Sequence, residues 1–174
     1  MKVPLRYLPN TLSKKDKLTQ ANMLKKSRKL YKTHKYYTRK SVESYKHKTS
    51  NHILDAQKMY KVKKIIPSEE LSKATGCSID ALNKIVNKGE GAYYSSGSRP
   101  NQTPQSWGYA RLASSITSGK SAAVDYDILY KGCNHKKKAF ILANKSRKKY
   151  KYGHSKTRKS SFEVWTPSKE IQIK

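Results

Sequence analysis

The sequence predicts a mainly α protein, with a small helical central domain flanked by long, basic, partly extended arms. Apolar residues recur at helical spacing between capping residues and glycines, which is typical of short helices. The 13 tyrosines, 2 tryptophans and 2 phenylalanines indicate a chain that folds, although the apolar fraction is only 35%. The third observation is the charge, which is concentrated in the two ends of the chain.

The net charge of +28 is distributed unevenly. Residues 1–64 carry 19 basic and 3 acidic residues, residues 65–130 carry 6 of each, and residues 131–174 carry 14 and 2. This pattern predicts a basic Lys/Tyr-rich N-terminal arm with helices (1–64), a neutral helical core (65–130) and a basic C-terminal arm (131–174). Blocks of like charge are typical of segments that bind an anionic partner, such as nucleic acid, a membrane surface or an acidic protein.

Helices are expected at two places in the N-terminal arm. Ser13 is followed three residues later by Asp16, a capping pattern that predicts a helix over 14–31. Residues 32–48 have no clear period and are predicted to be extended. A shorter helix is predicted over 50–60, where apolar residues share one face.

The neutral core begins with two predicted helices. Acidic residues after Pro67 favour a helix start, and Gly76 is predicted to end that helix. Ser78 is predicted to cap a second helix over 79–88, which Gly89 would close. A helix, a tight glycine turn and a second helix have the spacing of a helix-turn-helix, with an ordinary helical hairpin as the default interpretation.

The rest of the chain is predicted to alternate between loop and helix. Glycines and prolines predict a long irregular loop over 89–104, followed by helices over 104–117 and 122–130 and a helix over 136–150. The end of the chain, 158–174, is predicted to be extended. The predicted buried residues of the helix 122–130 are Val124, Ile128 and Leu129, and the predicted anchors of the extended end are Phe162, Val164 and Trp165.

The two arms contain an internal repeat. Residues 26–41 align without gaps to residues 145–160, and ten of the sixteen pairs are identical. The interpretations are a chance alignment of lysine-rich sequence or two copies of an anion-binding element, in which Lys and Arg neutralise anions and Tyr rings stack. The predicted anion- or partner-binding residues are Lys26, Arg28, Lys29, Tyr31, Lys32, Arg39, Lys40, Lys145, Arg147, Lys148, Tyr150, Lys151, Arg158 and Lys159. The predicted contact residues of the loop are Tyr93, Tyr94, Arg99 and Asn101.

No catalytic constellation is found, and the protein is predicted not to be an enzyme. Asp125 and Asp127 are two residues apart, which on a helix directs their side chains apart, and they are expected to pair with the arms. Ser118 to Ser121 reads Ser-Gly-Lys-Ser, but the upstream glycine that a phosphate-binding loop requires is replaced by Ser114. We therefore expect no small-molecule substrate.

The cysteines and histidines are not predicted to bind a metal. Cys77, Cys133 and His135 match no standard zinc spacing. The two cysteines are interpreted as isolated thiols, which favours a reducing compartment. Neither a metal nor a cofactor is expected.

Three stretches carry a family resemblance: KSRKLYKTHKYYTRK, SNHILDA and GEGAYYSSGSRPNQTPQSWGYARLASSITSGKSAAVDYDIL. Together they resemble an uncharacterised family of small basic proteins of nucleocytoplasmic large DNA viruses (giant viruses). The resemblance extends from about Tyr7 to Lys145, and the string from Gly89 to Leu112 is its most specific part. It implies a viral origin and no catalytic residues.

These observations lead to three functional hypotheses. The first is a structural virion protein, a minor capsid protein whose basic arms tie together the major capsid subunits of a large icosahedral DNA virus. It would lie in the virion capsid, be assembled in the host cytoplasm, and contact major and other minor capsid proteins, with viral DNA or the anionic inner membrane as further partners. The alternative is a sequence-independent DNA-binding or genome-packaging protein. The third is a helix-turn-helix regulator, whose recognition helix is poor in arginine.

Overall fold

The structure is a computed structural model that describes residues 2–151 and the backbone of residues 159–161. The elements in chain order are strand β1 (Lys2–Pro4), the 3-10 turn η1 (Leu5–Tyr7), helices α1 (Lys14–Tyr31), α2 (Asn51–Tyr60), α3 (Glu69–Thr75), α4 (Ile79–Ser95), α5 (Pro104–Ile116), α6 (Lys120–Val124), α7 (Tyr126–Gly132) and α8 (Lys138–Tyr150), and strand β2 (Lys159–Ser161). The two strands pair antiparallel, with Lys2 opposite Ser161. The prediction of a mainly α fold is confirmed.

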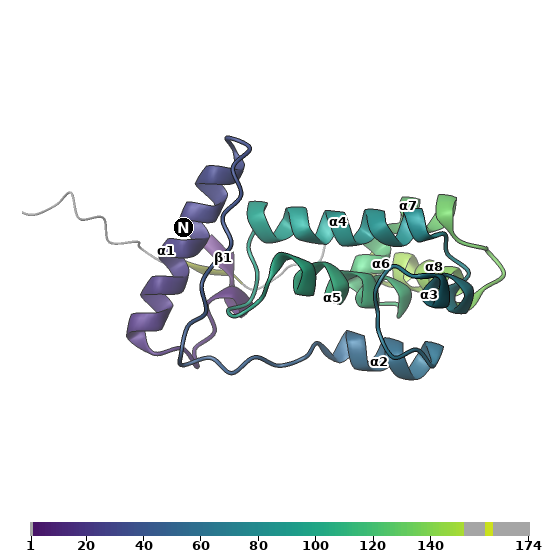
Figure 1. Cartoon of the computed structure of the whole chain (residues 1–174), viewed down its shortest axis with the longest axis horizontal. Helices are drawn as coiled ribbons and strands as arrows, with labels where there is room; N and C mark the ends of the chain where they lie inside the picture. Colours follow the sequence, from purple (N-terminus) through teal and green to yellow (C-terminus); the bar gives the residue numbers. More distant parts are fainter. Residues whose placement is uncertain (1, 152–158, 162–174) are drawn as a thin grey trace, which may run out of the picture.

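Figure 1 shows the arrangement of the helices. Helices α4 and α5 lie side by side as a long hairpin, with α1 across one end and α3, α6, α7 and α8 gathered at the other. An irregular segment leads from the region of α1 to α2, which packs on α5. Among the described helices, none is long and apolar enough to cross a membrane.

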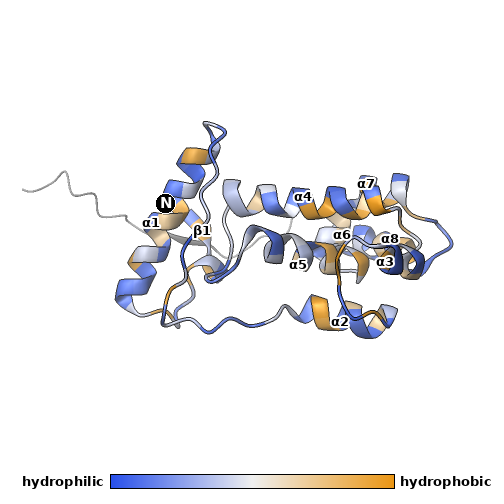
Figure 2. Cartoon of the chain, viewed as in Figure 1, coloured by the Kyte–Doolittle hydropathy of each residue, from blue (hydrophilic) through white to orange (hydrophobic). Residues whose placement is uncertain are grey.

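The main hydrophobic core lies around the α4–α5 hairpin. Its residues lie on both sides of positions 64 and 130, which are the boundaries of the predicted neutral core. Its members come from both basic segments as well as from the neutral centre. Figure 2 shows hydrophobic residues along α4 on the side that faces α5. The fully buried members from six helices include Ala56, Leu71, Leu82, Ile85, Leu112, Ile116, Leu129 and Ala143.

The helices with clear capping residues lie where the sequence predicts them. The hydroxyl of Ser13 accepts a hydrogen bond from Asp16 N at 3.1 Å, and α1 has the predicted bounds. Ser78 accepts from Ala81 N at 3.2 Å at the start of α4. Helices α2, α3, α5 and α8 fall within two residues of their predicted ranges. Residues 32–48 are predicted to be extended; residues 32–50 contain no helix or strand, and turns occur at 32–34 and 43–44.

The prediction that Gly89 ends helix α4 and begins a loop over 89–104 is wrong. The helix continues to Ser95, and the loop comprises only residues 96–103. A Cβ atom on Gly89 would lie 2.7 Å from the Cα of Gly108 in α5, so Gly89 allows the two backbones to touch rather than ending the helix. Gly97, with φ of 108°, has the left-handed backbone that follows the true end.

The predicted helix over 122–130 is two short helices, α6 and α7, which meet at Asp125. Leu129 is fully buried and Ile128 packs on the core, as predicted. The prediction for Val124 is wrong, because its side chain is 44% exposed. The break turns Val124 outward and places Asp125 inside.

The interpretation of Cys77 and Cys133 as isolated thiols is also wrong, because they form a disulfide. Cys77 follows α3 and Cys133 follows α7, and the two short segments around them run antiparallel. Backbone hydrogen bonds from Ser78 N to Gly132 O and from Asn134 N to Gly76 O, both 2.8 Å, hold the segments together. The sequence separation of 56 residues concealed this pairing.

The N-terminal segment builds two small cores of its own. Val3, Tyr7, Leu8, Ala21 and Leu24 form one cluster, against which Trp107 of α5 packs. The second cluster contains Leu12, Met23 and Val42, with Tyr37 and Tyr45 at its edge. The predicted anchors Phe162, Val164 and Trp165 lie outside the described residues.

Candidate functional site

The first six residues of each copy of the internal repeat, 26–31 and 145–150, form the last turns of α1 and α8. In each copy the serine is buried and its hydroxyl donates to a backbone carbonyl of another element: Ser27 to Tyr94 O at 3.2 Å, and Ser146 to Gly119 O at 2.7 Å. The repeated serine therefore fixes a helix end on the body of the protein. Because neighbouring helix positions point in different directions, fixing the serine turns the adjacent lysines to solvent.

The lysines of the repeat are exposed. Within the described part of the chain, the acidic partners of ion pairs are Asp80 and Asp125, and their cations are Lys84, Lys88 and Arg111. None of these cations belongs to the repeat. The exposed repeat lysines are Lys26, Lys29, Lys32, Lys40, Lys145, Lys148 and Lys151.

Several arginines and tyrosines of the repeat contact other parts of the protein. Arg28 donates Nη2 and Nε to Ser96 O, at 2.6 and 3.2 Å. The guanidinium of Arg147 lies 4.3 Å from the ring centroid of Tyr126. The half-buried Tyr31 stacks on Tyr94, with ring centroids 6.5 Å apart.

Three predicted residues of the repeat remain, namely Tyr150, Arg158 and Lys159. Tyr150 is half-buried, and the amino group of Lys120 lies 5.9 Å from its ring centroid. Arg158 lies outside the described residues, and only the backbone of Lys159 is described, as part of β2.

The position of Arg39 contradicts the expectation that this residue binds an external anion. Its guanidinium is buried, lies 3.7 Å from the ring centroid of Tyr93, and donates to Ser27 Oγ, Tyr93 O and Ser98 Oγ at 2.8 to 3.1 Å. Burial lowers the pKa of Arg39 and raises the pKa of the Tyr93 hydroxyl. Both side chains are therefore internal parts of the joint between α1 and the α4–α5 hairpin.

The predicted loop contacts also have structural roles, with one exception. Tyr93 and Tyr94 belong to α4, and the Tyr93 side chain is fully buried. The side-chain amide of Asn101 accepts from Val42 N at 2.8 Å and donates to Tyr45 O at 2.6 Å, which ties the loop to the irregular segment. Arg99 is the one of the four that is exposed.

Arg99 lies at the edge of a groove of about 610 Å³ between α5, residues 45–53 and residues 119–124. We call it the α5 groove. Its described lining contains no aspartate or glutamate. The basic residues that line it are Arg6, His47, Lys48, His52, Arg99, Arg111 and Lys120, and the aromatic residues are Tyr7, Tyr45, Trp107 and Tyr150.

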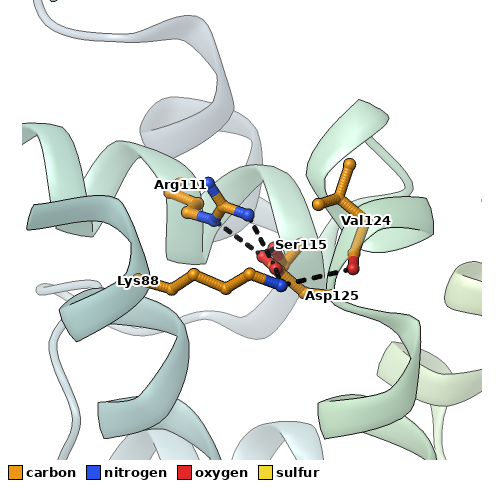
Figure 3. Close-up of polar contacts among 5 residues, drawn as sticks. All are labelled: Lys88, Arg111, Ser115, Val124 and Asp125. Atoms are coloured by element: carbon orange, nitrogen blue, oxygen red, sulfur yellow. Dashed lines mark hydrogen bonds and ion pairs between the residues drawn. The ribbon is translucent and has the colours of Figure 1, made fainter. Parts of the chain in front are cut away.

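An ion cluster around Asp125 adjoins the groove (Figure 3). The fully buried carboxylate accepts two hydrogen bonds from Arg111, Nε to Oδ2 at 2.9 Å and Nη2 to Oδ1 at 2.7 Å. Ser115 Oγ donates to Oδ2 at 3.0 Å, and Lys88 Nζ lies 3.0 Å from Oδ1. The expectation that Asp125 pairs with an arm is wrong, because its partners lie on α4 and α5.

The cluster shapes the electrostatics of the groove. One carboxylate faces two cations, so the cluster keeps a net positive charge. Arg111, which also lines the groove, is held by its two bonds to Asp125. Asp127 is exposed and contributes nothing to this cluster. The arrangement is suited to binding an anion, and the part of the chain that is described contains no group of three metal-ligating side chains.

The α5 groove was missed by sequence reasoning, because its lining comes from segments far apart in the chain. In the sequence, Arg6 and Lys48 belong to the general positive charge of residues 1–64. The one usable signal was the placement of Arg99 in a loop rich in glycine and proline.

Comparison with known protein families shows a match. The sequence model of a family described as "Family of unknown function (DUF5824)" matches residues 4–131. No curated protein and no solved structure matches the chain. The matched range includes the Asp125 cluster and most of the α5 groove, but not α8. Since it covers well over half of the sequence, the chain belongs to this family of unknown function, DUF5824.

Proposed function

We propose that this protein binds nucleic acid through its basic surface without reading the base sequence. The observation that carries the proposal is the pair of helix ends formed by the internal repeat. In both, a buried serine fixes the helix and the adjacent lysines face solvent with no acidic partner in the described residues. Exposed, uncompensated lysines release counterions when they meet phosphates, which gives strong binding at low salt.

The fold favours this function over the bridging of capsid subunits. A bridging arm has to leave its own chain, whereas Leu8, Leu24 and Arg39 are buried against α4, α5 and their connecting loop. A minor capsid role in a virion remains a second proposal, supported by the sequence resemblance. Fractionation of purified particles tests it: recovery of the protein with the empty shell would support the capsid role, and recovery with DNA would support nucleic-acid binding.

Binding to DNA at several salt concentrations tests the leading proposal. We expect similar affinity for unrelated duplexes of about 20 base pairs and a steep loss of affinity with salt. In the variant Lys29→Gln/Lys148→Gln, the slope of log K against log salt should fall by about 2, since each lost phosphate contact contributes about 0.9.

The control removes the same charge elsewhere. Lys58 on α2 and Lys73 on α3 are exposed lysines outside the repeat, and their double change to glutamine should leave the slope nearly unchanged. Equal effects of the two variants would show that the repeat has no special part in binding. A strong preference for one base sequence would favour the helix-turn-helix regulator instead.

A further inference from the structure

The α5 groove is too small for a duplex and large enough for one strand. Its volume of about 610 Å³ lies in the range of pockets that hold small ligands. Along α5 it extends from Ser106 to Ser114, about 12 Å at 1.5 Å per residue. The major groove of a duplex alone is about 12 Å wide, so a whole duplex cannot enter.

The charges around the groove are suited to phosphate. Arg6, Lys48 and Arg99 line it, are exposed, and have no acidic partner in the part of the chain described. His47 and His52 add imidazole donors. Asp125, which binds the groove residue Arg111, is fully buried and is also paired with Lys88.

Arg111 is prepared to donate to a ligand. Its bonds to Asp125 use Nε and Nη2, and Figure 3 shows the remaining terminal nitrogen directed away from the carboxylate. A guanidinium that is fixed by one carboxylate loses little further freedom when it binds another anion.

An aromatic side chain at the same groove offers a stacking surface. Trp107 is half-buried and lines the groove, and its ring meets Tyr7 edge to face, with centroids 6.0 Å apart and planes at 74°. The contact fixes the indole in place. Bases stack on such rings without regard to sequence, because every base has a π face.

We propose that the α5 groove binds nucleotide units of a single-stranded nucleic acid, with Arg99, Lys48 and Arg6 on the phosphates and Trp107 against a base. The proposal rests on the proposed function and deepens it, since it adds a site for single strands to a surface that binds any nucleic acid. The recognised chemistry, a phosphate beside an aromatic base, is shared by a strand and by a free nucleotide.

The test compares single and double strands by fluorescence anisotropy. The probes are a labelled oligothymidylate of about ten nucleotides and a labelled duplex of about 20 base pairs. Arg99→Gln should weaken oligothymidylate binding about tenfold and duplex binding less than about twofold, because only the single strand reaches the groove. Lys73→Gln, an exposed lysine on α3 with the same loss of charge, is the control and should affect both equally and weakly.

A second variant separates shape from charge. Ala110 lies on α5 in the groove lining, and Ala110→Leu fills the groove without changing the charge. It should also weaken oligothymidylate binding and spare duplex binding, with an unchanged unfolding midpoint showing that the fold is intact. Weakening of both probes to the same extent by Arg99→Gln and by Ala110→Leu would overturn the groove proposal and leave the proposed function standing. If the unsubstituted protein bound neither probe, both the groove proposal and the proposed function would be overturned.

Competition with adenosine monophosphate distinguishes the source of the ligand. If the groove takes strands, adenosine monophosphate should displace the oligothymidylate only at concentrations far above those of a competing unlabelled strand. Displacement at similar concentrations, abolished by Arg99→Gln, would assign the same phosphate-and-base chemistry to a free nucleotide and would overturn the assignment to a strand.

Discussion

Replacing Asp125 by asparagine should destabilise the protein more than any other neutralisation of a single acid in the described chain. The carboxylate is fully buried and binds Arg111 twice, Lys88 and Ser115. Asparagine has nearly the same size but no charge, and its amide NH₂ would face the N–H groups of Arg111 where a carboxylate oxygen now accepts. The change therefore leaves two cations without their counter-ion around a packed site.

The expected loss can be estimated from the exposure of the partners. Removing one member of a buried ion pair costs about 3–5 kcal/mol. Lys88 is 46% exposed and can turn to solvent, whereas the Arg111 side chain is only 18% exposed. We therefore expect a loss near the lower end, about 3 kcal/mol. With an m value of about 2 kcal/mol per molar urea, the unfolding midpoint should fall by about 1.5 M.

Urea unfolding followed by far-UV circular dichroism measures this shift, and the chain supplies a matched control. Asp127 is two residues away, exposed, and carries the same charge. Asp127→Asn changes the net charge equally and should alter stability by about 0.5 kcal/mol or less. Indistinguishable midpoints for the two variants would show that the Asp125 cluster does not hold α4, α5 and the α6–α7 junction together.

Three further predictions concern packing, cross-linking and pH. Gly89→Ala should destabilise the protein by about 1–3 kcal/mol in urea unfolding, because the added methyl meets the α5 backbone. Gly91→Ala, whose added methyl would make an ordinary van der Waals contact with the Tyr31 hydroxyl at 3.7 Å, should stabilise it by up to about 1 kcal/mol. Thiol titration of the unreduced, denatured protein should find no free thiol, and reducing Cys77 and Cys133 should cost about 4 kcal/mol for the 56-residue separation. Burial raises the pKa of Tyr60, so its contribution to stability is complete below the ordinary pKa of about 10 and is lost above it. In thermal melts, Tyr60→Phe should flatten the decline above about pH 10, and an unchanged decline would contradict this assignment.

Local sequence signals predicted most of the helices. The hydroxyls of Ser13 and Ser78 each accept a backbone N–H in the next turn, an interaction that depends on residues three apart. The same holds for the end of α3, where Gly76 has φ of 73°. Such signals are short-range, so a single sequence reveals them.

Residues with more than one possible role were assigned wrongly. Gly89 has the same sequence signature whether it ends a helix or lets two helices touch, and only the position of Gly108 decides between them. Arg39 has the sequence context of a solvent-facing cation, but Ser27, Tyr93 and Ser98 surround it. In each case the deciding partner lies far away in the sequence.

The candidate site likewise has some features that the sequence predicts and others that depend on contacts between distant segments. The excess of positive charge and the repeated Lys-Ser-Arg-Lys follow from the sequence, and with them the expectation of an anionic partner. Whether a given cation reaches that partner depends on burial. Tertiary contacts withdrew Arg39 into the interior and left Lys29 and Lys148 at the surface.

The sequence by itself determined the helical class, most helix ends and the large excess of positive charge, because these depend on neighbouring residues and on a sum of charges. Only the tertiary structure decided the disulfide, the Asp125 cluster and the α5 groove. Each of these brings together residues from segments that no local pattern connects, as Arg6, Lys48 and Arg99 are brought to one groove. Their proximity is a consequence of how the helices and the N-terminal segments pack together, and packing is a property of the whole chain.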